Sequence, residues 1–559
     1  MRKYFFTAVS AISVIILSSC SSKLGSLSAD NFSVDPTPLE VKGGQVEAVI
    51  NGKFPEKYMK RKAVVTVVPE LRYGNGMKAE GTGATFQGEK VLGNDQTISY
   101  RLGGRYSMKT VFDYVPEMLT SDMYLTFNAR VGRKTVQVPA VKVSYGVVAT
   151  SELYRQALAS DGGSIAPDSF ERIRNEKLDA NVKFLINQAT LRQSELQNNS
   201  VQEFVRLLKQ INKDRGESLE LTSIDVAAFA SPEGGYSYND RLANRRQEAS
   251  EEYVRQQLKA ENLTTDIDAR YTAQDWEGFQ QLVQASNIQD KEVILRVLSM
   301  YKDPEEREQQ IRNMSHVFEE LMDGVLPELR RARMTINYNV VGRSDEQIQS
   351  QYTADPTKLS VEEMLYAATL TNNSTEKENI YRTAARLYDK DYRALNNLGV
   401  IAFNRGNNAV AKDFFQQALR VDPKAPEVFA NLALINLKEG NLSEAENNLS
   451  RAIDANGYNR VAATLNIAKG NYALAEQQCG TTASNTAALA QLLNKNYEQA
   501  IKTLDAVREP NALTSYLHAI VAARKGNKFA AKSYLKEAIE KDPSLKAYAD
   551  KDLELSILN

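Results

Sequence analysis

The sequence predicts a multidomain protein with an N-terminal all-β sandwich, a central α+β domain and a C-terminal all-α solenoid. Three observations lead to this prediction. Residues 25–148 are rich in Val, Thr and Tyr and are broken by Gly and Pro, residues 178–343 alternate strand and helix periodicities, and residues 356–559 repeat every 34 positions. With 559 residues, 42% of them hydrophobic, the chain is long enough for several domains with packed cores.

The first twenty residues have the pattern of a secretory leader. Arg2 and Lys3 precede an apolar stretch, 4–17, that is short for a hydrocarbon core of about 30 Å. The stretch ends in Leu-Ser-Ser-Cys, with Cys20 last, and small residues before a Cys resemble the bacterial lipobox. The resemblance implies that residues 1–19 are a signal peptide and that Cys20 becomes the lipidated first residue, firmly anchored by several acyl chains. An ordinary leader with an accidental Cys is the alternative.

The resemblance to lipoproteins also implies a location. The residues after Cys20 lack the acidic cluster that exports some Bacteroidetes lipoproteins to the outer face. We therefore expect an outer-membrane protein, lipid-anchored, whose body faces the periplasm. Cys479 is the one other cysteine, so no intrachain disulfide is expected and this thiol is predicted to lie in a core. The net charge of −1 gives no argument for a nucleic-acid partner.

Residues 20–148 are predicted to comprise the lipid anchor and the β-sandwich domain. "GGQVEAVING" and "KAVVTVVPEL" are strand-like, and "TVQVPAVKVSY" alternates after a turn at Gly132. Short strands with regular turn signals favour a sandwich. The block has no His and no Cys beyond the anchor, which indicates a spacer or contact domain. Residues 149–177, with "ASDGGSIAPDS", are expected to be a linker with room for one short helix.

Residues 178–343 are predicted to form a sheet with helices packed on it. "ANVKFLINQATL", "LELTSIDVAAFA", "DIDARYTA" and "RRARMTINYNVV" are strand-like, and "SVQEFVRLLKQI" carries apolar residues at helical spacing. A second helix is expected over 239–258, and "KEVILRVLSM" and "IRNMSHVFEELM" are also expected to be helical.

The second of these helices brings two arginines close to a strand end. On a wheel of about 100° per residue with Leu242 at zero, Ala249 and Tyr253 fall within about 20°, Arg246 at about 40° and Arg245 at about −60°. An arginine beside an apolar stripe needs an anionic or carbonyl partner, because its unpaired burial is costly.

This stretch resembles the peptidoglycan-associating domain of OmpA-like proteins. That family has a strand ending in Gly-aromatic-Thr-Asp, a loop with Gly, and then Asn, Leu and a paired Arg-Arg or Arg-Ala on a helix. The matching residues here are Ala228-Phe229-Ala230-Ser231, Gly234, Asn239, Leu242, Arg245 and Arg246. The resemblance covers 178–343, with an insertion between about 280 and 325.

The resemblance implies a ligand site for diaminopimelate. Arg246 would hold the ligand carboxylate, since a guanidinium binds a planar acid group with two hydrogen bonds. The family's Asp, which holds the ligand amine, is Ser231 here, and only Glu233 stands close enough in the sequence to replace its charge. The predicted peptidoglycan-binding residues are therefore Arg246, Ser231, Glu233, Asn239 and Arg245. In the alternative, Arg246 binds backbone carbonyls or Glu233 and anchors the loop without any ligand.

The C-terminal repeat resembles the tetratricopeptide family. Its signature is Leu398-Gly399, Gly406, Ala411, Phe415, Ala418 and Pro423, which recurs 34 residues later and again near the end of the chain. The block 356–559 is therefore expected to hold about five to six helix pairs, with 358–391 as an atypical first repeat. The family's concave groove implies a protein partner. The residues expected to line it are Asn396, Asn397, Phe403, Asn431 and Asn436.

Enzymatic activity, a cofactor and a metal site are not expected. His316 and His518 lie in no motif with a nucleophile or a metal-ligand spacing, and no phosphate-binding Gly loop is present. The main hypothesis is a non-enzymatic lipoprotein scaffold that links the outer membrane to peptidoglycan and to a partner bound by the repeats. The alternative is a periplasmic assembly factor for secreted or surface structures with no real peptidoglycan binding. A wall-modifying enzyme is disfavoured.

Overall fold

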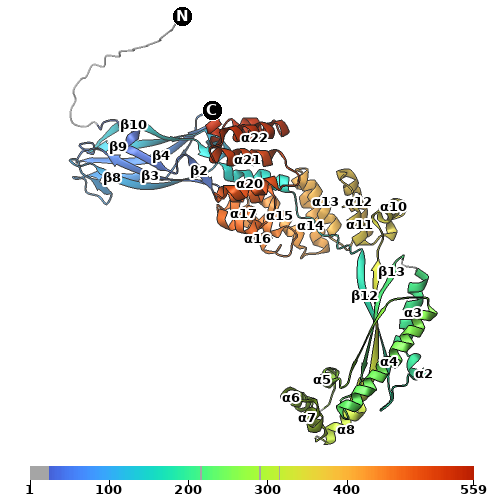
Figure 1. Ribbon diagram of the computed structural model, residues 1–559. Coiled ribbons are helices and arrows are strands. Elements are labelled where there is room, and N and C mark those ends of the chain that lie inside the picture. Colours follow the sequence, from blue (N-terminus) through green and yellow to red (C-terminus); the bar gives the residue numbers. More distant parts are fainter. Residues whose placement is uncertain (1–23, 215–216, 289–290, 314, 559) are drawn as a thin grey trace, which may run out of the picture. The chain divides into compact units, whose positions relative to one another are not determined.

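The computed structural model describes residues 24–214, 217–288, 291–313 and 315–558 (Figure 1). The predicted signal peptide 1–19 and the lipidation site Cys20 lie outside the described residues. The chain forms two compact units, one comprising the chain up to Asp168 with Thr371–Asn559, and one comprising Ser169–Leu370. Within the described ranges, no helix has the length and apolar character needed to cross a membrane.

The N-terminal part of the first unit is sheet-rich. One sheet contains β1 (Phe32–Asp35), β3 (Gln45–Phe54), β2 (Leu39–Lys42), β11 (Val147–Val148) and β8 (Gly104–Asp113), which pairs with β3. The other runs β10 (Lys134–Tyr145), β9 (Asp122–Val131), β4 (Ala63–Tyr73), β6 (Ala84–Gly88) and β7 (Gln96–Ile98), with β5 (Met77–Glu80) beside β4. Every second residue of β3 and β8 is buried, and the inward residues of both sheets join one hydrophobic core.

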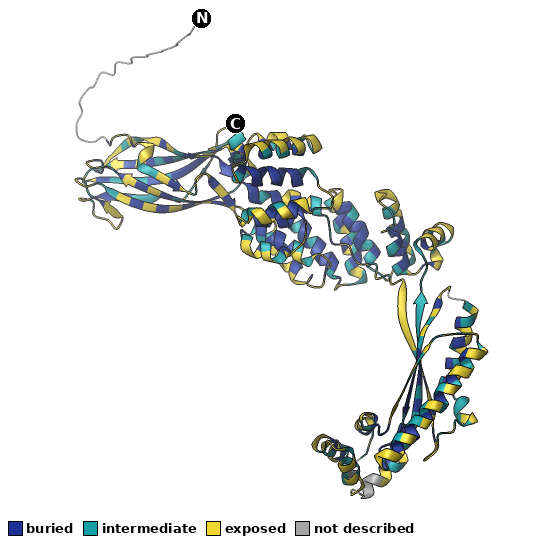
Figure 2. Ribbon diagram, in the orientation of Figure 1, coloured by how far each residue is buried: buried dark blue, intermediate teal, exposed yellow. Residues whose placement is uncertain are grey.

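The C-terminal part of the first unit is a helical array. Five consecutive helix hairpins follow α12 (Ser374–Leu387), and the array ends with α23 (Leu545–Ala549) and η5 (Leu553–Leu558). The pairs are α13 (Arg393–Asn404) with α14 (Asn408–Val421), α15 (Pro426–Glu439) with α16 (Leu442–Ser450), α17 (Tyr458–Ala468) with α18 (Tyr472–Cys479), α19 (Asn485–Leu493) with α20 (Tyr497–Asp505), and α21 (Ala512–Arg524) with α22 (Lys528–Lys541). The first helix of a pair is the more buried one, as α21 shows along its length (Figure 2). The repeat prediction is confirmed in this region, and Cys479 is buried as expected.

The turn inside each hairpin explains the spaced glycines of the repeat. Gly406, Gly440, Gly470 and Gly526 have φ values of +78°, +81°, +78° and +76°, in the left-handed region that glycine adopts without steric cost. Lys495 stands at the equivalent turn between α19 and α20 with φ +66°. The backbone geometry of the hairpin is therefore kept even where the glycine is missing.

The β-domain and the array share contacts within the first unit. Ser151, in the short helix η3 (Thr150–Leu153), donates to the Val41 carbonyl at 3.0 Å, and Tyr472 on α18 donates to the same oxygen at 3.4 Å. Close to these contacts, the turn between β2 and β3 approaches the array, where a Cβ on Gly43 would stand 3.1 Å from the Lys469 carbonyl oxygen. The β2–β3 end of the β-domain therefore packs against the repeats.

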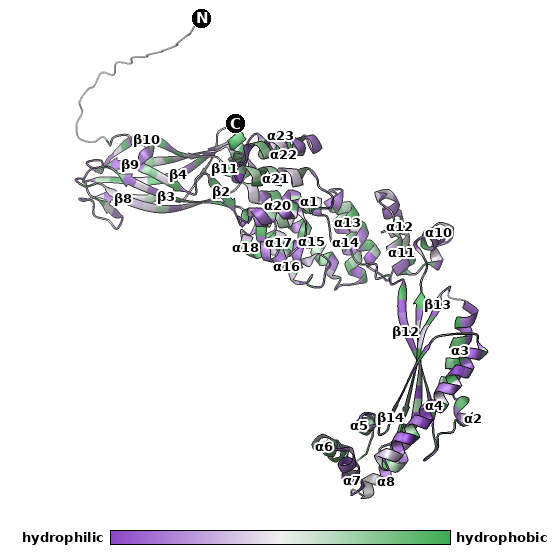
Figure 3. Ribbon diagram, viewed as in Figure 1, coloured by the Kyte–Doolittle hydropathy of each residue, from purple (hydrophilic) through white to green (hydrophobic). Residues whose placement is uncertain are grey.

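The second unit contains a four-stranded sheet covered on one face by two helices. The strand order is β12 (Ile173–Lys183), β15 (Arg331–Val341), β13 (Leu219–Phe229) and β14 (Asp266–Thr272), with β13 and β14 parallel and the other pairs antiparallel. Helices α3 (Asn199–Asp214) and α4 (Tyr236–Ala260) pack on the inward face and share a core with it. Figure 3 shows α4 as mostly hydrophilic, so its buried stripe is narrow.

Three further segments complete the second unit. A short helix, α2 (Gln193–Leu196), precedes α3. Between β14 and β15 the chain inserts α5 (Trp276–Ala285), α6 (Lys291–Met300), α7 (Pro304–Arg312), α8 (Ser315–Gly324) and α9 (Leu326–Leu329), which have a small core of their own. After β15 come α10 (Asp345–Ala354), η4 (Pro356–Lys358) and α11 (Val361–Ala367). Residues 356–370, which the repeat pattern assigned to the C-terminal block, thus belong to the second unit.

Candidate functional site

The groove of the helical array contains a segment of the same chain. Helix α1 (Tyr154–Asp161) packs against α15, α17, α19 and α21, and residues 162–168 continue from it in extended form. Ser164 and Ala166 are buried while Ile165 and Pro167 are exposed, which is the alternation of an extended strand. The stretch that the sequence suggested to be a linker is therefore part of the packed first unit.

Asparagine side chains of the array bind the main chain of this segment. Asn431 accepts from the Ser164 N–H at 2.6 Å and donates to the Ser164 carbonyl at 2.8 Å. Asn397 does the same for Ala166, at 2.8 and 3.2 Å, and Asn396 adds a bond to the Ser164 carbonyl at 3.0 Å. An amide side chain offers one acceptor and two donors, so it can pair with both main-chain groups of a residue as a neighbouring strand would.

Two glycines let the backbone come this close. Gly162 has φ +72° and ψ −177°, a region accessible essentially to glycine alone. A Cβ on Gly163 would stand 2.9 Å from both the Asn431 Oδ1 and the Val400 Cγ1 atoms. The "DGG" of the sequence therefore serves a turn out of α1 followed by a close approach to the groove wall.

Charged groups hold both ends of the segment. The Asp161 carboxylate accepts from the N–H groups of Asn485 and Thr486 at 3.2 and 3.0 Å, at the start of α19, where a negative charge is favourable. Arg460 donates to the Gly162 carbonyl at 2.6 Å, and Arg393 donates to the Asp168 carbonyl at 3.0 Å. The segment is thus fixed from the end of α1 to its last residue.

Of the five residues expected to line the groove and bind a partner, only some line it in the structure. Asn396, Asn397 and Asn431 line it and bind the chain's own segment. Phe403 is 3% exposed and belongs to the array's core, and Asn436 is half-buried. Their binding to a partner stays a prediction.

Sequence reasoning missed Asn404, which accepts from the Gly163 N–H at 3.2 Å, and Arg460. No signal in their own repeats distinguishes these two residues from other polar residues. The "DGG" stretch was interpreted only as part of a linker.

Arg246 in the second unit is deeply buried and bound to main-chain carbonyls. The side chain is 1% exposed and donates to the carbonyls of Gln188 at 2.9 Å, Phe229 at 2.9 Å and Leu185 at 3.2 Å. Its guanidinium lies 5.0 Å from the ring centre of Phe184. Burial, with the like charge of Arg330, lowers the pKa of Arg246 to about 10. These contacts match the alternative in which Arg246 binds backbone carbonyls without any ligand, although the carbonyls belong to Leu185, Gln188 and Phe229 rather than to the loop 231–237.

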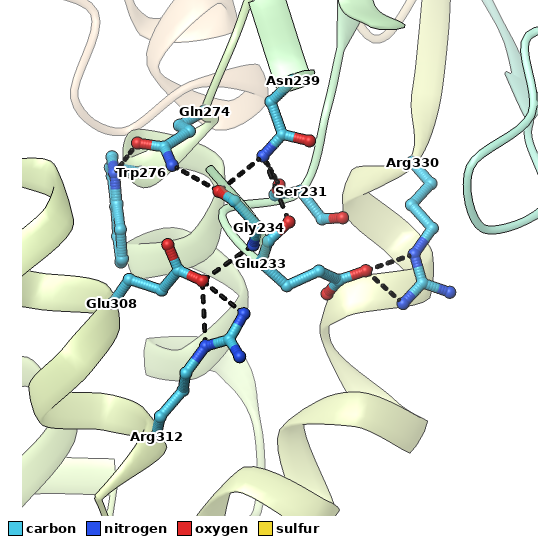
Figure 4. A network of polar contacts seen from close by, with 9 residues as sticks. All are labelled: Ser231, Glu233, Gly234, Asn239, Gln274, Trp276, Glu308, Arg312 and Arg330. Atoms are coloured by element: carbon cyan, nitrogen blue, oxygen red, sulfur yellow. Dashed lines mark hydrogen bonds and ion pairs between the residues drawn. The ribbon is translucent and has the colours of Figure 1, made fainter. Parts of the chain in front are cut away.

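The loop before α4 is closed by polar contacts (Figure 4). Asn239, 3% exposed, donates to the carbonyls of Ser231, Glu233 and Gly234 at 3.1, 3.1 and 3.2 Å. Glu233 is paired with Arg330, whose Nε and Nη2 atoms lie 3.0 and 2.6 Å from one carboxylate oxygen. Asn239 therefore acts here as a loop clamp.

The helical insertion also reaches this loop. Glu308 on α7 accepts from the Gly234 N–H at 2.7 Å and is itself bound by Arg312 at 2.9 Å (Figure 4). Gln274 donates to the Gly234 carbonyl at 3.2 Å and accepts from Trp276 at 3.3 Å. The Glu308 carboxylate therefore accepts the hydrogen bond of the Gly234 N–H group, which faces the insertion.

The residues predicted to bind peptidoglycan are therefore close together, and most of them already take part in contacts within the protein. Ser231, Asn239 and Arg246 are buried, Glu233 is in an ion pair, and Arg245 is exposed. The small cavity under the loop has a volume of about 20 Å³, which is the space of one water molecule. Their role as ligand-binding residues stays a prediction, and the contacts favour a structural role.

The described residues carry few features of catalytic chemistry. Among them, no group of three or more His, Cys, Asp and Glu side chains is arranged to hold a metal ion. His518 is 9% exposed and stacks on Tyr534 with ring centres 4.6 Å apart, and burial lowers its pKa. This histidine is a packed residue of the array.

Comparison with known proteins identifies one of the repeats. A family model for the tetratricopeptide repeat matches residues 392–425, which contain α13 and α14. No curated protein sequence matches the chain.

Several solved structures with tetratricopeptide repeats are similar to part of the chain. A tetratricopeptide repeat protein from Parabacteroides merdae is 15% identical over 38% of this chain and 90% of its own, with a TM-score of 0.28. PilW, a type IV pilus biogenesis factor, is 18% identical over 34% of this chain and 94% of its own, with a TM-score of 0.26. Pseudomonas aeruginosa pilF is 15% identical over 38% of this chain and 97% of its own, with a TM-score of 0.26.

Proposed function

We propose, from the premise that residues 392–425 are a tetratricopeptide repeat, that this protein is a non-enzymatic, lipid-anchored scaffold of the cell envelope. Tetratricopeptide arrays are protein–protein interaction scaffolds, and no catalytic family matches the chain. The proposed anchor is Cys20 in the outer membrane, with the body in the periplasm. The observation that carries the proposal is the set of bonds from Asn397, Asn431 and Arg460 that fixes residues 162–166 in the array.

These hydrogen bonds favour a scaffold over a protein that binds transient clients. Both main-chain polar groups of Ser164 and of Ala166 are satisfied by side chains of the array, so the segment up to Asp168 is a packed part of the first unit. An array with an empty groove would be the expected arrangement for a carrier of transient clients. The occupied groove therefore supports the scaffold over the assembly factor, which remains the alternative.

The partner would enter where the groove stays open. Beyond α1 the array has a hollow of about 560 Å³, lined among others by Asp161, Arg460, Asn485, Arg508 and Asn511. Both charge signs and two amides line this hollow, which suits an extended peptide with polar main-chain contacts. We place the partner's contact here rather than over Asn396, Asn397 and Asn431, which bind residues 164–166 of the chain's own segment.

Photo-crosslinking in cells tests this contact. A photoreactive residue at Arg508, exposed at the hollow, should capture a stable envelope protein, while one at the exposed Lys536 of α22 should not. Capture of secreted or surface-structure subunits at Arg508 would favour the assembly factor. Equal capture at both positions would overturn the assignment of the hollow.

The α+β domain is proposed as the wall-side module. Its resemblance to the peptidoglycan-associating domain suggests a direct wall contact, while the buried Arg246 and the paired Glu233 favour contact through a wall-bound protein. Sedimentation of the whole chain with purified sacculi, with and without other envelope proteins, distinguishes the two. Sedimentation of the pure chain supports direct binding, and sedimentation only in the mixture supports the protein contact. If neither occurs, the wall-side role is lost.

A further inference from the structure

We propose that the end of the β-domain formed by the β3–β4, β6–β7, β7–β8 and β9–β10 connections is a contact surface for a membrane that contains anionic phospholipid. These connections are residues 55–62, 89–95, 99–103 and 132–133, and together they are called the tip. Strand β3 begins at the β2–β3 turn, beside the array, and ends at Phe54, so the tip lies at the other end of the strand from the repeats.

Main-chain bonds tie the four connections into one rigid surface. Lys57 donates to the Tyr100 carbonyl at 2.6 Å, Lys90 to the Arg61 carbonyl at 2.7 Å and Gly132 to the Lys62 carbonyl at 2.9 Å. Lys53 and Arg105 are opposite each other in the β3–β8 pairing at the base of the tip. Side chains far apart in the sequence are therefore presented on one surface.

The tip carries a strong positive charge. The four connections contain seven Lys and Arg against three Asp and Glu, an excess of four positive charges in a chain with a net charge of −1. Four more basic residues stand at the adjoining strand ends, Lys53, Arg105, Arg130 and Lys134. Among the described residues of the tip, the one ion pair joins Arg61 to Glu89, at 3.6 Å. The positive charge is thus largely uncompensated and available to a negatively charged surface.

Two exposed leucines lie in adjacent connections, Leu92 between β6 and β7 and Leu102 between β7 and β8. Leu92 is 102% exposed and Leu102 is 69% exposed, the highest values among the large aliphatic side chains of the described residues. Lys90 and Arg101 flank them in the sequence. A single exposed leucine is ordinary, but two exposed leucines with basic residues nearby in the sequence match a surface whose charges meet phosphates while its apolar residues enter the lipid boundary.

The path of the chain brings this end close to the proposed anchor. Phe32 pairs with Gly52 near the end of β3, so β1 starts on the tip side of the domain. Leu24 is 6% exposed and belongs to the domain's core, and the proposed anchor Cys20 stands four residues earlier in the sequence. This step rests on the proposed lipid at Cys20, whereas the charge and the leucines do not.

Flotation with lipid vesicles tests the tip independently of the anchor. The unlipidated chain from Ser21, which keeps every described residue, is mixed with vesicles of phosphatidylcholine alone or with phosphatidylglycerol. Binding is expected with phosphatidylglycerol only, and it should weaken as salt is raised. The double variant Leu92→Ser, Leu102→Ser and the double variant Lys57→Glu, Arg101→Glu should each weaken binding by about tenfold or more.

The control is a matched pair of changes on the array. Ile453→Ser, at a residue 66% exposed, and Lys536→Glu should leave flotation unchanged. Equal loss in tip and control variants, or no flotation of the original chain, would overturn the proposal. Binding to soluble polyglutamate but not to vesicles would assign the tip to an acidic protein instead. Failure of the Cys20 anchor is distinguished by lipid labelling of the full chain in cells, compared with Cys20→Ser.

Discussion

Asn431 pairs with both main-chain polar groups of Ser164, accepting from its N–H at 2.6 Å and donating to its carbonyl at 2.8 Å. The two residues are separated by 267 positions, and both are almost fully buried. This pairing makes the segment after α1 a fixed element of the array. It replaces the inter-strand hydrogen bonds of a sheet by side-chain amides.

Removing this amide should loosen the first unit. In Asn431→Ala the Ser164 N–H loses its acceptor inside the protein, and a buried unsatisfied donor costs about 1–3 kcal/mol. We expect a lower midpoint for the first unit in calorimetry and faster protease cleavage within 162–168. Asn436→Ala, on the same helix but half-buried, should change neither. Unchanged cleavage in Asn431→Ala would show that the other contacts suffice.

A methyl group on Gly163 should displace the same segment by steric overlap. The new Cβ of Gly163→Ala would lie 2.9 Å from Val400 Cγ1 and from Asn431 Oδ1, closer than packing allows. Overpacking of this kind costs about 1–3 kcal/mol. Hydrogen exchange of the Ser164 and Ala166 amides should accelerate.

Gly25→Ala is the matched control for this change, because no atom lies within 4 Å of the Cβ it would gain. If amide exchange in Gly163→Ala equals that of the control, the segment has room that the structure does not show.

Loss of Arg246 should destabilise the second unit. Arg246→Ala leaves the carbonyls of Leu185, Gln188 and Phe229 without this donor and removes a large buried side chain, at a cost of about 3 kcal/mol or more. Arg246→Lys should recover only part of the stability, because a compact ammonium lacks the spread, planar donors with which the guanidinium binds three carbonyls. The measurement is the unfolding midpoint of the second unit in calorimetry.

Arg245→Ala serves as the control for Arg246, since Arg245 is the exposed neighbour on the same helix. A variant at Arg246 that keeps full stability but no longer sediments with sacculi would contradict the structural role and restore the ligand-binding one.

The end of the array should gain stability as the pH falls. Burial raises the pKa of Asp552 from 3.8 to about 6, while Tyr516 donates to its carboxylate at 2.7 Å. Since the folded-state pKa is above the unfolded one, the contribution to stability is fully present below about pH 4 and is lost as the pH rises through about 6. The shift corresponds to at most about 3 kcal/mol.

The comparison with Asp552→Asn isolates this carboxylate. The variant has no charge to bury, so its melting temperature should vary less between pH 4 and pH 7. A slope equal to that of the original chain would assign the pH dependence to other groups. Arg524 and Glu554 face this site too, and their ion pair is kept in both proteins.

The elements with a clear period were predictable from the sequence. Strands β3, β4, β10 and β13 and the repeat helices follow alternations of polar and apolar residues that depend on short-range geometry. Arg246 was placed beside the buried stripe of α4, about 40° from its centre. In the structure it lies on the stripe itself, because the stripe also contains the polar residues Asn239 and Ser250, which a wheel centred on apolar residues leaves out.

The occupant of the groove was not predictable in the same way. The sequence singled out Asn396, Asn397 and Asn431 by their position in the repeat, which identifies a surface but not what covers it. The amino-acid sequence of residues 162–168 does not show which side chains are buried, because Ser164 is buried and Ile165 is exposed. The hydrogen-bond partners of the segment lie more than 200 positions away. Pairing over such separations depends on the whole fold rather than on local preference.

The burial of residues 154–168 between helices made much later has a consequence for biosynthesis. The segment leaves the ribosome before the entire second unit, and its binding helices begin only at Arg393. Until then its amides face water, and the closure of a loop of this length must precede their pairing. The first unit, whose N-terminal part is translated first, can therefore be completed only after the repeats have been synthesised. Chains truncated before the repeats should be preferred targets of chaperones and proteases.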